Sequence, residues 1–170
     1  MHARQFARVA AVTVCGSLVL AACSGGGSRL TKAELIKQAD AICLEEQSKT
    51  AAIGAGLGAP TQANLQQYAD AFAQALSIFK DMAGKLKALK PPEADQATWD
   101  QIMSSLDQEI AAVQKAQEAA ANGDMTALNT AGQEIGTVDA KASQLAQGYG
   151  LTVCGGAGGS SSGSAPPPTP

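Results

Sequence analysis

LQQYADAFAQALSIFKDMAGKLKAL (residues 65–89) is the stretch that decides the fold. Its apolar side chains recur at spacings that alternate between three and four residues: Leu65, Tyr68, Phe72, Ala75, Phe79, Met82, Leu86 and Leu89. This spacing places them on one stripe of an α-helix and leaves polar residues on the opposite face. We therefore predict an amphipathic helix that starts at Thr61 and stops before Pro91, because proline cannot continue a helix.

Three further segments show the same helical period. The first follows a capping box at Thr31 and Glu34, fades near Thr50, and carries Leu35, Ala39, Ile42 and Cys43 on one face. The third covers about 93–121, with Trp99, Ile102, Leu106, Ile110, Val113 and Ala120 facing inward. The fourth starts after an N-cap at Asp124 and carries Leu128, Ala131, Ile135, Val138, Ala142, Leu145 and Tyr149.

Four amphipathic helices joined by short turns predict an all-α fold, an up-down four-helix bundle over residues 30–154. No segment alternates with the period of a β-strand. Residues 155–170 (GGAGGSSSGSAPPPTP) contain no apolar side chain larger than alanine or proline, so we expect a disordered tail.

The N-terminus has the layout of an export signal. Arg4 and Arg8 precede an apolar run, residues 9–22, that is shorter than the roughly 20 residues of a membrane span. The run ends in LAAC (residues 20–23), which resembles the bacterial lipobox. This resemblance implies cleavage after Ala22 and a lipid on Cys23. The glycine- and serine-rich SGGGSR that follows predicts a flexible tether, so residues 23–29 comprise the lipidated cysteine and the tether. Ordinary secretory cleavage is the alternative, and Leu20 fits it poorly because that position prefers small residues.

Two cysteines remain for the folded domain. Cys15 would leave with the signal and Cys23 would become a thioether, so Cys43 and Cys154 are left in an exported protein, where thiols pair. The rival interpretation, a two-thiol metal site, lacks a histidine or third thiol. We expect a Cys43–Cys154 disulfide that closes a loop of about 110 residues, with Leu151 and Val153 covering the side of the bundle.

The composition excludes several classes of function. The only histidine is His2, in the predicted signal, so histidine-dependent catalytic sites are excluded from the mature chain. The chain has 12 basic and 15 acidic residues and no basic stripe, which argues against nucleic acid as a partner. We predict no catalytic residue, no metal site and no cofactor. The acidic residues Glu45, Glu46, Glu109, Glu118 and Glu134 are interpreted as a solvated face.

Four features remain as candidates for function. Tyr68, Phe72, Phe79 and Trp99 could line a pocket for a small hydrophobic ligand, although heptad spacing favours plain core. Gly132 and Gly136 could bring the fourth helix close to a neighbour. The loop TAAIGAGLGAP (residues 50–60) offers Ile53 and Leu57 for a partner contact, and a flexible connection without a function is the equal alternative. Four lysines at the end of the second helix could face lipid headgroups, although complementing the helix dipole is the favoured interpretation: Lys80, Lys85, Lys87 and Lys90.

The mature chain resembles small helical lipoproteins and secreted proteins of high-GC Gram-positive bacteria. The features that carry the resemblance are ADAIC (residues 39–43), the Pro91-Pro92 break and YGLTVCG (residues 149–155). It implies an extracytoplasmic location and a disulfide pattern, and no activity. We expect a non-enzymatic binding or interaction module, anchored to the cell membrane by lipid, with a protein partner. A carrier of a small hydrophobic ligand is the alternative.

Overall fold

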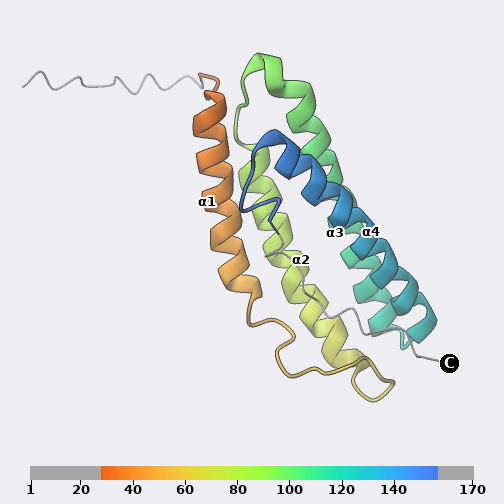
Figure 1. The fold of residues 1–170 in the computed structure, drawn as a ribbon. Coiled ribbons are helices and arrows are strands. Elements are labelled where there is room, and N and C mark those ends of the chain that lie inside the picture. Colours follow the sequence, from red (N-terminus) through yellow and green to blue (C-terminus); the bar gives the residue numbers. More distant parts are fainter. Residues whose placement is uncertain (1–27, 157–170) are drawn as a thin grey trace, which may run out of the picture.

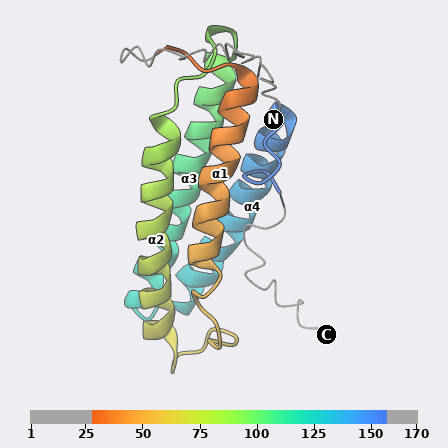
Figure 2. The same cartoon turned by 90° about the vertical axis from the view of Figure 1, so that its left-hand side faces the viewer.

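The computed structural model describes residues 28–156, and Figures 1 and 2 show them as helices packed side by side. The helices are α1 (Lys32–Thr50), α2 (Leu65–Lys87), α3 (Gln96–Ala121) and α4 (Met125–Tyr149), and a short 3-10 helix, η1 (Glu93–Asp95), precedes α3. Residues 28–156 contain no β-strand, so the predicted all-α class is confirmed for them. The predicted signal peptide, Cys23, and residues 157–170 of the predicted tail lie outside the described residues.

Local sequence signals set most of the helix ends. The Thr31 side chain accepts from the N–H of Glu34 while the Glu34 carboxylate accepts from the N–H of Thr31, so the capping box predicted for α1 is present. Asp124 caps α4 by accepting from the N–H of Ala127. Gly150 ends α4 with a φ of 110°, a left-handed conformation that side chains rarely adopt.

The start of α2 differs from the prediction. The helix begins at Leu65 instead of Thr61, because the Asn64 side chain organises the preceding residues into a turn. Its Oδ1 atom accepts from the N–H of Thr61 at 2.7 Å, and its Nδ2 atom donates to the carbonyls of Leu57 and Ala59. An asparagine that bonds to nearby backbone in this way stabilises a turn over a helix.

The core consists of two clusters of buried side chains, which follow one another along the long axis of the bundle. The first contains large side chains from all four helices and the segment after α4: Leu35, Ala39, Cys43, Ala83, Leu86, Trp99, Ile102, Met103, Leu106, Ala146, Tyr149 and Leu151. The second comes from α2, α3 and α4 and is rich in alanine: Leu65, Ala69, Ala116, Ala119, Ala120, Leu128 and Ala131.

The length of α1 explains this division. With 19 residues α1 spans about 28 Å, whereas the 26 residues of α3 span about 39 Å. Figures 1 and 2 show α1 stopping before the far ends of the other helices, where the loop of residues 51–64 continues. Helix α3 packs against both α2 and α4, and α1 packs against α2. The second cluster therefore holds only three helices, and small alanine side chains allow them to approach closely.

The segment after α4 lies against α1. Cys154 forms the expected disulfide with Cys43, with a Cα–Cα distance of 5.3 Å. Leu151 is 1% exposed, so it is part of the core, and Val153 is half-buried. No helix among residues 28–156 combines the length and the apolar character needed to cross a bilayer.

Candidate functional site

Trp99 lies at one end of the bundle, in the first turns of α3. Its side chain is 2% exposed and packs at a tilt against Tyr149 at the end of α4, with ring centroids 6.1 Å apart. The Tyr149 hydroxyl donates to Asp95 at 2.8 Å, and the Lys32 ammonium at the start of α1 lies 4.3 Å from the Tyr149 ring centroid. Burial, together with the hydrogen bond to Asp95 and its negative charge, raises the pKa of Tyr149. This aromatic pair therefore ties together three helix ends.

A shallow cleft of about 340 Å³ opens beside Trp99, between the end of α2 and the first half of α3. Its apolar lining comes from Leu89, Trp99 and Met103. Its polar lining contains two bonded pairs and one hydroxyl: Lys87 with Asp107, Gln96 with Asp100, and Ser104. The volume is at the small end of the range seen for ligand sites, and an apolar lining with a few polar groups is typical of them.

One polar atom of Trp99, a residue that lines this cleft, has no partner among the described residues. The indole N–H of Trp99 is buried and meets no acceptor. A buried donor without an acceptor costs roughly 1–3 kcal/mol, and most buried indole N–H groups in proteins are bonded. At this end of the bundle, Trp99 therefore has a hydrogen-bond donor that is free to bond an acceptor from another molecule.

The four aromatic residues predicted to line one ligand pocket are not brought together. Tyr68 and Phe72 pack against the second core cluster, with ring centroids 6.2 Å apart, and the Tyr68 hydroxyl donates to the Gly58 carbonyl. Phe79 is half-buried on α2 and belongs to neither cluster, whereas Trp99 belongs to the first. The heptad stripe runs the whole length of a long helix, so its members separate along the axis. Of the four, only Trp99 lines the cleft described above.

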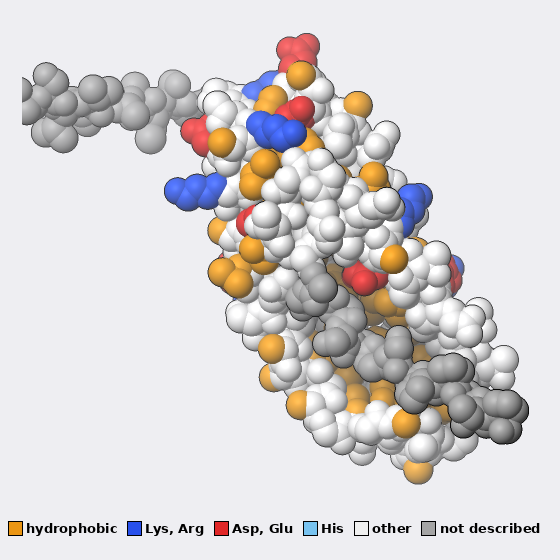
Figure 3. Space-filling model, viewed as in Figure 1, with side chains coloured by type: hydrophobic (Ala, Val, Ile, Leu, Met, Phe, Trp, Pro, Cys, Tyr) orange, Lys and Arg blue, Asp and Glu red, His pale blue; other side chains and the backbone are white. Residues whose placement is uncertain are grey.

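The loop after α1 packs onto α2 instead of extending into solvent. Ile53 and Leu57 are half-buried, and they line a second shallow cleft of about 270 Å³ with α2 residues such as Gln67 and Asp70. Gly54, Gly56 and Gly58 adopt positive φ values that permit this compact path. On the face shown in Figure 3 the visible charged side chains lie over the upper and middle parts, and none is visible at the lower end; residues 51–64 contain no charged residue. The loop surface is accordingly poor in charge.

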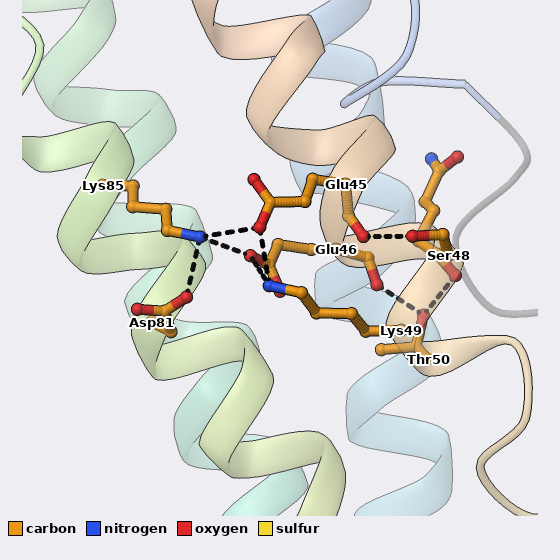
Figure 4. A network of polar contacts seen from close by, with 8 residues as sticks. Glu45, Glu46, Ser48, Lys49, Thr50, Asp81 and Lys85 are labelled. Carbon is orange, nitrogen blue, oxygen red and sulfur yellow. Dashed lines mark hydrogen bonds and ion pairs between the residues drawn. The ribbon is translucent and has the colours of Figure 1, made fainter.

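A charge cluster joins α1 to α2 (Figure 4). Glu46 is only 2% exposed, and its Oε1 atom lies 2.8 Å from Lys85 Nζ and 2.9 Å from Lys49 Nζ. Lys85 also pairs with Asp81 and Glu45, so carboxylates surround its ammonium. These contacts, with the hydrogen bond to Glu46 first, raise the pKa of Lys85. Glu46 Oε2 remains without a partner among the described residues.

The prediction of a fully solvated acidic face is therefore wrong at two positions. Glu46 is buried, and Glu109 is half-buried at a position where burial, followed by the negative charge of Asp139, raises its pKa to about 7. Glu45 and Glu118 are exposed, and Glu134 is half-buried and pairs with Lys115. The helical spacing of the sequence already indicated that Glu46 and Glu109 face inward. Glu46 continues the inward stripe of α1, and Glu109 falls three residues after Leu106, on the buried face of α3.

Two other predicted features also have a structural outcome. Lys85 and Lys87 pair with carboxylates, and Lys87 contacts the α3 residue Asp107 at 2.6 Å, so these two lysines do more than complement the dipole of α2. Gly132 and Gly136 are both exposed, and a Cβ atom added at either would have no other atom within 4 Å. They do not mediate close helix packing among the described residues.

The described residues contain no group of three or more histidine, cysteine or acidic side chains placed to hold a metal ion. Comparison of the chain with protein-family models, curated proteins and solved structures found no match. The residues and their geometry therefore carry the functional argument alone.

Proposed function

We propose that this protein is a lipid-anchored, extracytoplasmic binding module without enzymatic activity. The LAAC sequence at residues 20–23 supports the anchor, since it combines an aliphatic residue, two small residues and a cysteine after a short apolar run. The Cys43–Cys154 disulfide supports an oxidising compartment outside the cytoplasm.

The observation that carries the proposal is the attachment of the N-terminal segment to the Trp99 end of the bundle. Arg29 Nη1 donates to the Pro91 carbonyl at 2.9 Å and to Gln96 Oε1 at 2.8 Å, and the N–H of Leu30 donates to the Lys90 carbonyl at 2.8 Å. Gln96 also lines the cleft beside Trp99. Because a six-residue segment reaches at most about 20 Å, a lipid on Cys23 would hold this cleft close to the membrane surface.

We further infer that the four helices follow an up-down path. The Leu30–Lys90 bond supports this topology because it joins the start of α1 to the turn after α2. The Tyr149–Asp95 bond supports it as well, since it joins the end of α4 to the start of α3. On this path the loop of residues 51–64 lies at the end away from the membrane, where a protein partner could reach its charge-poor surface.

A carrier of a small hydrophobic ligand is the second candidate function. The cleft beside Trp99 favours it, because an apolar lining and an unbonded indole N–H occur together there. The site would lie on the flank of α2 and α3 instead of in the centre of the bundle. A carrier should retain its ligand through purification, and native mass spectrometry would detect it as an extra mass that leaves on denaturation.

The anchor is tested by metabolic labelling with a fatty-acid analogue in bacterial cells that express the full chain. The wild-type protein should incorporate the label and sediment with membranes, whereas Cys23→Ala should do neither. Cys15→Ala is the matched control, and it should behave as wild type because Cys15 lies in the predicted signal. Labelling that survives Cys23→Ala would overturn the proposed attachment site.

The protein partner is tested by photo-crosslinking on intact cells. A photoreactive amino acid at the exposed loop residue Ala55 should give a discrete adduct to a protein, and one at Gln108, on the exposed face of α3, should not. Equal adducts at both positions, or none at Ala55, would contradict a partner contact through the loop.

A further inference from the structure

Trp99, which lines the cleft, carries a hydrogen-bond donor with no acceptor among the described residues. Trp99 is 98% buried, and its indole N–H is the unpartnered atom. Most buried polar groups in native proteins have a partner, so an unpartnered donor calls for an explanation, and an acceptor that a bound molecule supplies is one. The position of Trp99 in the wall of a cleft provides a route for that ligand.

The rim of the cleft can open. Lys87 and Asp107 form an ion pair there, and their side chains are 44% and 54% exposed. Exposed pairs of this kind contribute little to stability, because water screens both charges. A ligand can therefore displace this pair at small cost.

The charges around the cleft restrict the ligand. Asp100 and Asp107 oppose an anion, and the single ammonium of the lining, Lys87, is already bound by both oxygens of Asp107. A quaternary ammonium would be attracted, but it offers no acceptor to the indole N–H. Leu89 and Met103 supply the apolar contacts for a chain or ring. A neutral acceptor attached to an apolar body satisfies all of these groups.

We propose that this cleft binds one small, neutral amphipathic molecule, whose hydrogen-bond acceptor bonds the Trp99 indole N–H and whose apolar part contacts Leu89 and Met103. This inference deepens the proposed binding function and rests on it. It does not depend on the lipid anchor. Molecules of this chemistry concentrate at a membrane surface, where the attachment of residues 29 and 30 would place the cleft.

The chain offers a clean reporter because Trp99 is its only tryptophan. The mature protein, as the cell produces it, is labelled with ¹⁵N-tryptophan and kept in phospholipid nanodiscs, so that the spectrum contains a single indole N–H signal. Three probes with the same eight-carbon chain are then added: 1-octanol, octanoate and octyltrimethylammonium. Octanol should move the indole proton downfield and saturate. Octanoate and octyltrimethylammonium should bind at least about tenfold more weakly, a difference of about 1.4 kcal/mol, because Asp100 and Asp107 repel the first and the second offers no acceptor.

Three variants locate the response. Ser104→Leu fills the cleft from an exposed position of α3 and should abolish the octanol shift, while Gln108→Leu, at an exposed position of the same helix that does not line the cleft, should preserve it. Asp107→Asn removes a carboxylate from the rim and should strengthen octanoate binding relative to octanol. All three sites are exposed, so unchanged helical circular dichroism should accompany each result.

Three results would overturn the inference. They are an indole signal that no probe moves, an equal response to octanol and octyltrimethylammonium, and an octanol response that survives Ser104→Leu. Fatty-acid labelling of Cys23 is read separately. A labelled protein with an unresponsive indole would leave the anchored module standing without this site, and an unlabelled protein with a saturable response would leave the site standing without the anchor.

Discussion

Asp40 Oδ1 accepts a hydrogen bond from the N–H of Cys154 at 3.2 Å, although the two residues are 114 positions apart in the chain. The same carboxylate accepts from the N–H groups of Thr152 and Val153, both at 3.0 Å. Because Asp40 lies one helical turn before Cys43, it holds the backbone after α4 in the position where the disulfide closes. The chain ends of the domain are therefore fixed by a carboxylate as well as by a covalent bond.

Asp40→Asn should lower the free energy of unfolding by about 1–3 kcal/mol, because an amide can replace only one of the two accepting oxygens and carries no charge. Urea unfolding of the oxidised protein measures the change. Asp70→Asn is the matched control, since Asp70 is exposed and among the described residues its side chain accepts from Gln66 alone, and it should change the value by less than about 0.5 kcal/mol. Equal effects of the two variants would contradict the role of Asp40.

Stability should also decrease in acid through Asp40. Partial burial acts to raise the pKa of this carboxyl, but the hydrogen bonds from Thr152, Cys154 and Val153 outweigh it and hold the pKa below its ordinary value. The stabilisation is therefore complete above the unfolded-state pKa of about 4 and is lost as the pH falls through the lower folded-state value. Unfolding measured from pH 5 to pH 2 should show a shallower decline in Asp40→Asn than in wild type.

Removal of the disulfide should cost more than any single hydrogen bond. The bond closes a sequence separation of 111 residues, for which the chain-entropy model gives roughly 4–5 kcal/mol. The double variant Cys43→Ser, Cys154→Ser should have a free energy of unfolding, measured in urea, that is lower by that amount. Its stability should no longer depend on reductant. A wild-type protein whose stability does not change on reduction would contradict this prediction.

The charge cluster of α1 and α2 predicts an order of effects. Lys85→Met removes one of the two cations that bind the buried Glu46 and should destabilise the protein strongly. Glu46→Leu removes the buried charge itself and should cost less, because Lys85 keeps Asp81 and Glu45. Thermal unfolding of both variants tests the order. Lys115→Met, which breaks an exposed pair with Glu134, is the control and should cost less than about 1 kcal/mol.

Glu109 should make the protein less stable as the pH rises. Burial, followed by the negative charge of Asp139, raises the pKa of Glu109 to about 7, whereas an unfolded glutamate titrates near pH 4.3. The folded state holds the proton more tightly, so the free energy of unfolding declines between those two values. Glu109→Gln should therefore be more stable than wild type at pH 8, by roughly 1–3 kcal/mol, and should lose this part of the pH dependence. Glu118→Gln, at an exposed site on the same helix, should show no such gain.

The periodic and capping residues determined much of the fold. The alternating spacing in residues 65–89 predicts α2, and Thr31 with Glu34 predicts the start of α1. Cys43 and Cys154 were paired correctly because elimination left no other partner for either. These signals are local or combinatorial, so they are readable without knowing where any helix lies. The start of α2 was missed because the Asn64 side chain stabilises a turn with backbone groups that a helical period does not reveal.

Positions along the bundle axis were decided by the tertiary structure. The sequence places Phe72 and Trp99 on inward faces, but only packing shows that they belong to different core clusters and cannot line one pocket. It marks Glu46 as charged, but only the approach of Lys85 from α2 makes burial of that charge tolerable. A helical period fixes the direction in which a side chain points and leaves open which residue of another helix it meets. The sequence alone therefore determined the helices, the inward stripes and the disulfide, whereas the cleft beside Trp99 exists only because α2 and α3 come together there.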